Sequence, residues 1–111
     1  MKTTALIIGL FIIFQACKKT DRSLPACINA KITQFKHTVP CKDAKVDEYL
    51  FQNKLVYVFD EGTCVRDGAA LVYNQTCESI GYLGGFIGNT TIQGVDFSEE
   101  AVFKRNITLV Q

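Results

Sequence analysis

The residues of this chain with the most evident chemistry are its cysteines. Besides Cys17, the 111-residue chain has four cysteines, Cys27, Cys41, Cys64 and Cys77. An even number of cysteines in an exported chain is typical of two disulfides. No two of them stand in the C-x-x-C spacing of many zinc sites, so we predict no metal site. A cysteine nucleophile needs a free thiol beside a base, and the chain has a single histidine, His37, so the cysteines do not indicate catalysis either.

A predicted helix restricts how these four cysteines pair. A helix from Cys27 to about His37 separates Cys27 from Cys41 by about 15 Å, since each helical residue rises by about 1.5 Å. A disulfide tolerates a Cα separation of at most about 6.8 Å. This disfavours Cys27–Cys41 and with it Cys64–Cys77. Two alternatives remain open, Cys27–Cys64 with Cys41–Cys77, and Cys27–Cys77 with Cys41–Cys64, and either would staple the helix to the sheet.

Acidic residues flank Cys64 in the segment from Asp60 to Asp67. Carboxylates at this density suggest an alternative function, a small metal-binding protein or hydrolase that uses this loop. However, calcium loops place oxygen ligands at alternating positions, and Asp60-Glu61-Gly62-Thr63 lacks that order. A short chain also rarely builds the cleft that would desolvate a catalytic pair. We therefore predict no catalytic residue and no cofactor.

The glycine-rich run Gly84-Gly85-Phe86-Ile87-Gly88-Asn89 has the most unusual composition in the chain. Glycines at this density indicate backbone angles that other residues resist, or the close approach of another molecule. The run lacks the lysine and the following helix of a phosphate-binding loop. It is interpreted either as a tight structural loop or as a binding loop. The predicted binding residues are Gly84, Gly85, Phe86, Gly88 and Asn89.

The N-terminus has the pattern of an export signal. Lys2 precedes an uncharged apolar run from Ala5 to Phe14, which is too short for a membrane span of about 20 residues. The run ends at Ala16-Cys17, and a small residue directly before a cysteine resembles the lipobox of bacterial lipoproteins. We therefore predict a signal peptide over residues 1–16, lipidation of Cys17 and a polar tether over residues 17–24.

This signal and the charge of the chain suggest a location and a class of partner. The lipidated cysteine would hold the protein to the outer membrane or another envelope membrane of a Gram-negative cell, facing the periplasm or the cell surface. The net charge is +1 and no basic stripe occurs, so nucleic acid is not expected as a partner. The expected partners are the membrane, through the lipid, and another envelope protein.

One helix is predicted after the tether. Ser23 is suited to cap it and Pro25 to lie in its first turn. An apolar stripe at helical spacing follows, formed by Leu24, Ile28, Ile32 and Phe35. Thr38, Val39 and Pro40 end the helix.

The remainder of the chain has β patterns. The predicted strands are Val46–Gln52, Leu55–Asp60, Ala69–Asn74, Cys77–Leu83 and Val102–Val110. The tight turn between the first two is expected at Asn53-Lys54, and Leu55–Asp60 is apolar on both faces, as in a buried central strand. A short extended piece is expected over Thr90–Gly94, and one helical turn capped by Asp96 or Ser98. Residues 25–111 therefore form one small α+β domain, with the helix packed on an antiparallel meander of four to five strands.

Several of these segments resemble a known family. The matching residues are Pro25-Ala26-Cys27-Ile28, the hairpin from Tyr49 to Asp60, Gly62-Thr63-Cys64, Val72-Tyr73, the Gly84–Asn89 loop and Asp96-Phe97. With these residues the chain resembles a family of small uncharacterised bacterial lipoproteins that carry a domain of unknown function. The resemblance implies an envelope lipoprotein and assigns no activity. The predicted role is a non-catalytic binding, inhibitory or structural module.

Overall fold

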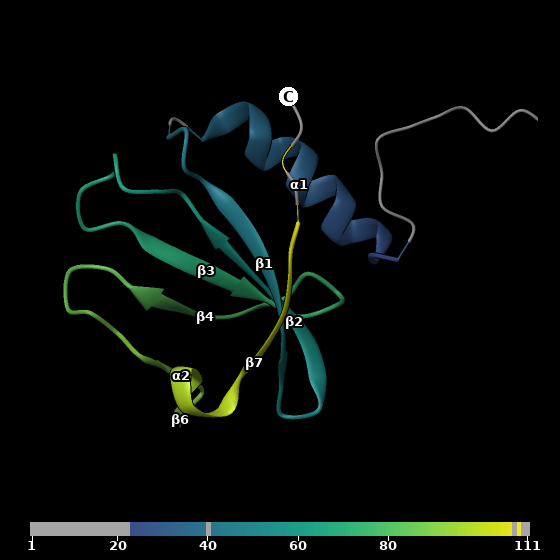
Figure 1. Ribbon diagram of the computed structural model, residues 1–111, viewed down its shortest axis with the longest axis vertical. Helices are drawn as coiled ribbons and strands as arrows, with labels where there is room; N and C mark the ends of the chain where they lie inside the picture. The colour runs from purple at the N-terminus through teal and green to yellow at the C-terminus, as the bar shows by residue number, and fades with distance from the viewer. Residues whose placement is uncertain (1–22, 40, 108, 110–111) are drawn as a thin grey trace, which may run out of the picture.

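The computed structural model describes residues 23–39, 41–107 and 109. It confirms the α+β class, with one long helix packed against a five-stranded antiparallel sheet (Figure 1). The elements are α1 (Ala26–Thr38), β1 (Lys45–Phe51), β2 (Lys54–Asp60), β3 (Ala69–Tyr73), β4 (Ser79–Gly84), β5 (Thr91–Ile92), β6 (Val95–Asp96), α2 (Phe97–Glu100) and β7 (Val102–Ile107).

The strand order in the sheet is β4-β3-β2-β1-β7. The first four strands form a meander, and β7 returns from the end of the chain to pair with β1. This pairing runs from Val46 opposite Ile107 to Leu50 opposite Val102, with a register shift between Glu48 and Tyr49. The last strand is therefore paired with the first strand of the sheet.

Strand β2 lies at the centre of the sheet and is buried on both faces, as its sequence predicted. Tyr57 and Phe59 face α1 and join a core cluster with the helical stripe Leu24, Ile28 and Ile32. Val56 and Val58 face the opposite side, where they pack with Ile92 and Phe97. The segment β5–β6–α2 covers this second face, so the sheet lies between two layers.

The start of α1 differs from the prediction. Pro25, not Ser23, is the N-cap residue, and its carbonyl oxygen accepts hydrogen bonds from the backbone N–H groups of Ile28 and Asn29 at 3.0 and 3.1 Å. The Ser23 hydroxyl instead accepts a hydrogen bond from Arg105 Nη2 on β7 at 2.7 Å. A serine this far ahead of the helix is thus engaged by the sheet and does not cap.

One turn and the start of one strand also lie one or two residues from their predicted places. The β1–β2 turn is Gln52-Asn53, not Asn53-Lys54, because both residues have positive φ and Lys54 already pairs with Phe51. Strand β4 begins at Ser79, since Cys77 has a φ of +66°, which interrupts an extended backbone.

The C-terminal part of the domain follows the prediction more closely. The piece expected over Thr90–Gly94 is β5 and its turn, and it pairs with β6 in a hairpin that the sequence pattern did not predict. Asp96 caps α2 by accepting a hydrogen bond from the Glu99 N–H at 3.0 Å. Strand β7 is described as far as Ile107, so the predicted end at Val110 lies outside the described residues.

The disulfides are Cys27–Cys77 and Cys41–Cys64, one of the two predicted alternatives. Their Cα separations are 6.1 and 5.5 Å. The first joins the start of α1 to the turn between β3 and β4. The second joins the segment after α1 to the β2–β3 loop. Together they fix both ends of the helix to the sheet.

Candidate functional site

The Gly84–Asn89 loop continues β4 as a closed hairpin. The backbones of Gly84 and Asn89 exchange two hydrogen bonds, of 2.8 and 2.9 Å. Inside this pair, the Gly88 N–H donates to the Gly85 carbonyl at 3.1 Å. Gly84, Gly85 and Gly88 all have positive φ, between 68° and 81°, a region that favours glycine. The glycines thus allow a four-residue turn to close at the end of the strand.

Two further contacts hold this hairpin in place. The side-chain amide of Asn89 donates to the carbonyl oxygens of Tyr82 and Thr91, at 2.6 and 2.8 Å. The Gly85 N–H donates to the Gly68 carbonyl of the β2–β3 loop at 3.1 Å. The loop is therefore fixed to its own strand, to the following strand and to the neighbouring loop.

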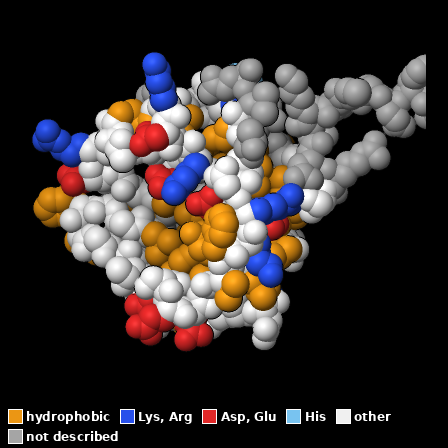
Figure 2. Space-filling model, in the orientation of Figure 1, with side chains coloured by type: hydrophobic (Ala, Val, Ile, Leu, Met, Phe, Trp, Pro, Cys, Tyr) orange, Lys and Arg blue, Asp and Glu red, His pale blue; other side chains and the backbone are white. Residues whose placement is uncertain are grey.

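Phe86 and Ile87 form the apex of the hairpin. The exposed fraction is 85% for Phe86 and 73% for Ile87, the two highest values among the large hydrophobic side chains of the described residues. Figure 2 shows hydrophobic side chains at the left edge of the molecule, where Figure 1 places the loop after β4. The loop holds its two large apolar side chains in solvent and contributes neither to the core.

The loop lies far from the start of the domain. Strand β4 begins beside Cys77, which is tied to Cys27 at the start of α1, and ends at the loop. In Figure 1 the start of α1 is accordingly on the right and the loop on the left. The N-terminal end of the described domain and the loop therefore lie on opposite sides of the molecule.

The acidic residues of the β2–β3 loop do not gather. One Asp60 oxygen accepts a hydrogen bond from the Gly62 N–H at 2.9 Å. The Thr63 hydroxyl and N–H donate to Asp43, at 2.7 and 3.1 Å, and these bonds lower the pKa of the Asp43 carboxyl. Nowhere in the described part of the chain do three His, Cys, Asp or Glu side chains come together as metal ligands would.

Two carboxylates on β1, which the sequence pattern did not single out, are buried. Asp47 and Glu48 are only 7% and 6% exposed. Asp47 accepts a hydrogen bond from Asn106 at 2.8 Å, and Glu48 pairs with Arg105 at 3.1 Å. Both partners lie on β7. The pairing of β1 with β7 therefore accounts for the burial of the two carboxylates, whose role is structural. The only signal in the sequence was the acidic pair itself, inside a strand pattern.

The predicted anchor lies outside the described residues, which begin at Ser23. The signal peptide, Cys17 and most of the tether are therefore not among the residues that the structure describes. Within the described residues, none of the helices has the length and hydrophobicity needed to cross a membrane.

A family model described as a domain of unknown function (DUF6970) matches residues 30–108. The chain belongs to this family. The match extends from within α1 through β7 and includes the glycine-rich loop, the core cluster on the face opposite α1 and three of the four paired cysteines. Neither a curated protein nor a solved structure matches the chain. Membership of this family therefore identifies the domain and assigns no activity to it.

Proposed function

We propose that the protein is an envelope-anchored lipoprotein that acts as a non-catalytic binding module. A lipid on Cys17 would attach it to the membrane, and the Gly84–Asn89 loop would contact a partner protein, with an inhibitory or structural effect. The observation that carries this proposal is the exposure of Phe86, 85%, at the apex of a closed loop.

The composition of the loop supports a binding role. Solvent exposure of a phenylalanine forgoes the free energy of burying its apolar surface, about 25 cal/mol per Å². Aromatic side chains dominate the energetics of many protein interfaces. The hydrogen bonds between Gly84 and Asn89 order the loop before any contact forms, which lowers the entropic cost of association.

The shape and charge of the apex indicate the kind of partner. Phe86 and Ile87 protrude, so the complementary surface is a concave apolar pocket. No charged residue occurs from Ser79 to Gln93, so this pocket needs no charge of its own. Because the loop and the start of α1 lie on opposite sides (Figure 1), a chain anchored before α1 would direct the loop away from its own membrane. We therefore infer a protein partner and not the lipid bilayer.

A photo-crosslinking experiment tests this proposal. Benzoylphenylalanine replaces Phe86 in the full chain, expressed in the cells that naturally produce it. Phe103 is the matched control position, because it is an exposed phenylalanine, 54%, on β7. A discrete protein adduct is expected from position 86 and not from position 103, and Ile87→Ser should abolish it. The same adducts from both positions, or adducts to lipid alone, would refute the proposal.

A further inference from the structure

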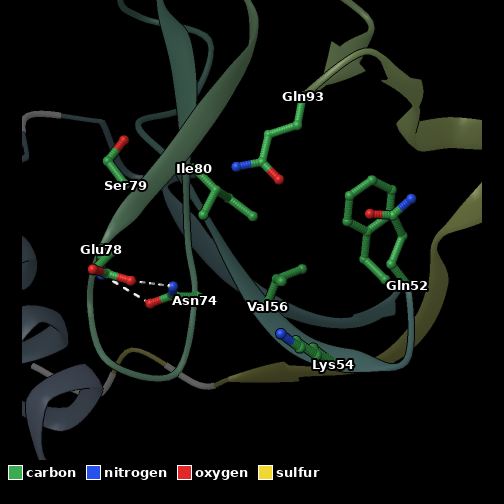
Figure 3. A pocket seen from close by; sticks show the side chains of 9 residues that line it. Gln52, Lys54, Val56, Asn74, Glu78, Ser79, Ile80 and Gln93 are labelled. Atoms are coloured by element: carbon green, nitrogen blue, oxygen red, sulfur yellow. Dashed lines mark hydrogen bonds between the residues drawn. The ribbon is translucent and has the colours of Figure 1, made fainter.

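A second candidate site lies at the end of the sheet opposite the loop. Three turns meet there, between β1 and β2, between β3 and β4, and between β5 and β6, and they border an open pocket of about 450 Å³ (Figure 3). This volume is in the usual range for small-molecule sites. The lining residues are Phe51, Gln52, Lys54, Val56, Asn74, Glu78, Ser79, Ile80 and Gln93.

The pocket has an apolar floor and a polar rim. In Figure 3, Val56 and Ile80 lie at the centre, and Gln52, Lys54, Glu78 and Gln93 surround them. Lys54 and Glu78 carry opposite charges, so the rim has no net charge. The Glu78 carboxylate already accepts hydrogen bonds from the Asn74 amide at 2.9 Å and from the Thr76 hydroxyl at 3.4 Å. A neutral ligand suits this rim better than an ion.

Two rim residues have an unusual backbone. Gln52 and Gln93 are each the first residue of a two-residue turn, and each has a φ of +52°. Turns of this kind favour Asn, Asp or Gly at that position, and glutamine is not among the residues enriched at positive φ. Both glutamine side chains are exposed on the rim. Strained residues of this kind concentrate at functional sites, so their shared position on one pocket points to a ligand.

The groups on the rim indicate the chemical class of that ligand. A primary amide both donates and accepts hydrogen bonds, as a hydroxyl group does. Gln52 and Gln93 provide amides from two different turns, and Ser79 adds a hydroxyl, whereas the Asn74 amide is engaged within its own turn by Glu78 and Thr76. A sugar ring presents hydroxyl groups around its edge and C–H groups on its face, which match the polar rim and the apolar floor of Phe51, Val56 and Ile80.

We propose that this pocket binds a neutral polyhydroxylated ligand, a mono- or disaccharide or the end of a longer glycan. The proposal goes beyond the protein-binding role of the Gly84–Asn89 loop. It uses other residues at the other end of the sheet and does not depend on that role.

Ligand titrations of the full chain, labelled with ¹⁵N and observed by NMR, test the proposal. The probes are N-acetylglucosamine, its β-1,4-linked disaccharide, maltose and cellobiose, with glycylglycine and inorganic phosphate as charged comparators. At least one sugar should saturably shift the backbone amides of Gln52, Glu78 and Gln93. Gln93→Gly and Gln52→Gly remove the amides and leave a residue that prefers positive φ, so the variants should fold.

The glycine variants should weaken sugar binding at least about tenfold, whereas Gln34→Ala, on the exposed surface of α1, should bind as the wild type does. Equal affinity of the glycine variants and the wild type would overturn the assignment. So would saturation by glycylglycine or phosphate without any response to the sugars, or no response to any probe. Unchanged thermal unfolding of the variants would show that lost binding reflects the amides and not the fold.

Discussion

Glu48 on β1 and Arg105 on β7 form an ion pair across adjacent strands, with 3.1 Å between Oε1 and Nε. The Glu48 side chain is only 8% exposed, whereas that of Arg105 is 37% exposed. Arg105 also donates to Ser23 at 2.7 Å, so one guanidinium joins β1, β7 and the start of the described chain. The pair fixes the last strand against the first.

Removal of the arginine should destabilise the domain. Arg105→Ala leaves the Glu48 carboxylate buried without this partner, which should lower the free energy of unfolding by about 1–3 kcal/mol. Urea unfolding measures the change. Lys104→Ala, on the exposed neighbouring position, is the control and should stay within about 0.5 kcal/mol of the wild type. Equal stability of the two variants would mean that the pair contributes nothing.

Phe86 and Phe97 should respond oppositely to truncation. Phe86 is 85% exposed, so Phe86→Ala should leave the free energy of unfolding within about 0.5 kcal/mol and should lower partner affinity by about 2 kcal/mol or more. Phe97 is 5% exposed and packs against Phe51 and Tyr49, so Phe97→Ala should cost about 3–5 kcal/mol of stability. Thermal unfolding, and crosslinking from benzoylphenylalanine placed at position 87, separate the two effects. Loss of stability in Phe86→Ala with unchanged crosslinking would assign the loop a structural role.

The two disulfides should differ in their contribution to stability. Cys27–Cys77 spans 50 residues and Cys41–Cys64 spans 23. Because the longer loop restricts the unfolded chain more, removing Cys27–Cys77 should cost about 0.7 kcal/mol more than removing Cys41–Cys64. Guanidinium unfolding of the two paired Cys→Ala variants gives the comparison. A larger loss for Cys41→Ala with Cys64→Ala would contradict this order.

Acid should weaken the cap of α2. The Ser98 hydroxyl, and then the Glu99 N–H, hydrogen-bond to Asp96 and lower the pKa of this carboxyl below its ordinary value of 3.8. A carboxyl with a lowered folded-state pKa contributes stability above its unfolded-state pKa and loses it as the pH falls through the folded-state value. The melting temperature of the wild type should therefore decline more steeply below pH 3.8 than that of Asp96→Asn, which keeps a good capping residue. If the melting temperatures of the wild type and Asp96→Asn fall equally steeply with pH below 3.8, Asp96 has no role in the acid response.

Lipidation of Cys17 is a separate prediction. Cells that express the full chain are labelled with a fatty-acid analogue, and the wild type is compared with Cys17→Ser. The wild type should be labelled and found in the membrane fraction, and the variant should lose both properties. Cys64→Ser is the control for the loss of a cysteine. Equal labelling of the wild type and Cys17→Ser would disprove the anchor.

Local patterns in the sequence were enough to predict most of the elements. The stripe Leu24, Ile28, Ile32 and Phe35 gave α1 and its buried face, and the apolar run in β2 gave the central strand. The rise of the helix also left the observed disulfide pairing as one of two alternatives. These inferences worked because they depend on spacing within one segment.

Contacts between distant segments could not be predicted in this way. Nothing in the pattern of Val102 to Ile107 indicates that this strand pairs with β1, and the burial of Asp47 and Glu48 follows from that pairing. The candidate pocket was missed for the same reason, since Gln52, Glu78 and Gln93 come from three separate turns. In the loop, the glycines indicated an unusual backbone, but the exposure of Phe86 depended on the closure of the hairpin.

The place of β7 also has a consequence for the order in which the protein folds. Until β7 is available, β1 is an edge strand of the β1–β4 meander and carries Asp47 and Glu48 without Asn106 and Arg105. Charges on an edge strand oppose its pairing with strands of other molecules. Glu48, which Arg105 later neutralises, and Asp47, which Asn106 later hydrogen-bonds, would thus protect the incomplete sheet from aggregation while synthesis is still under way.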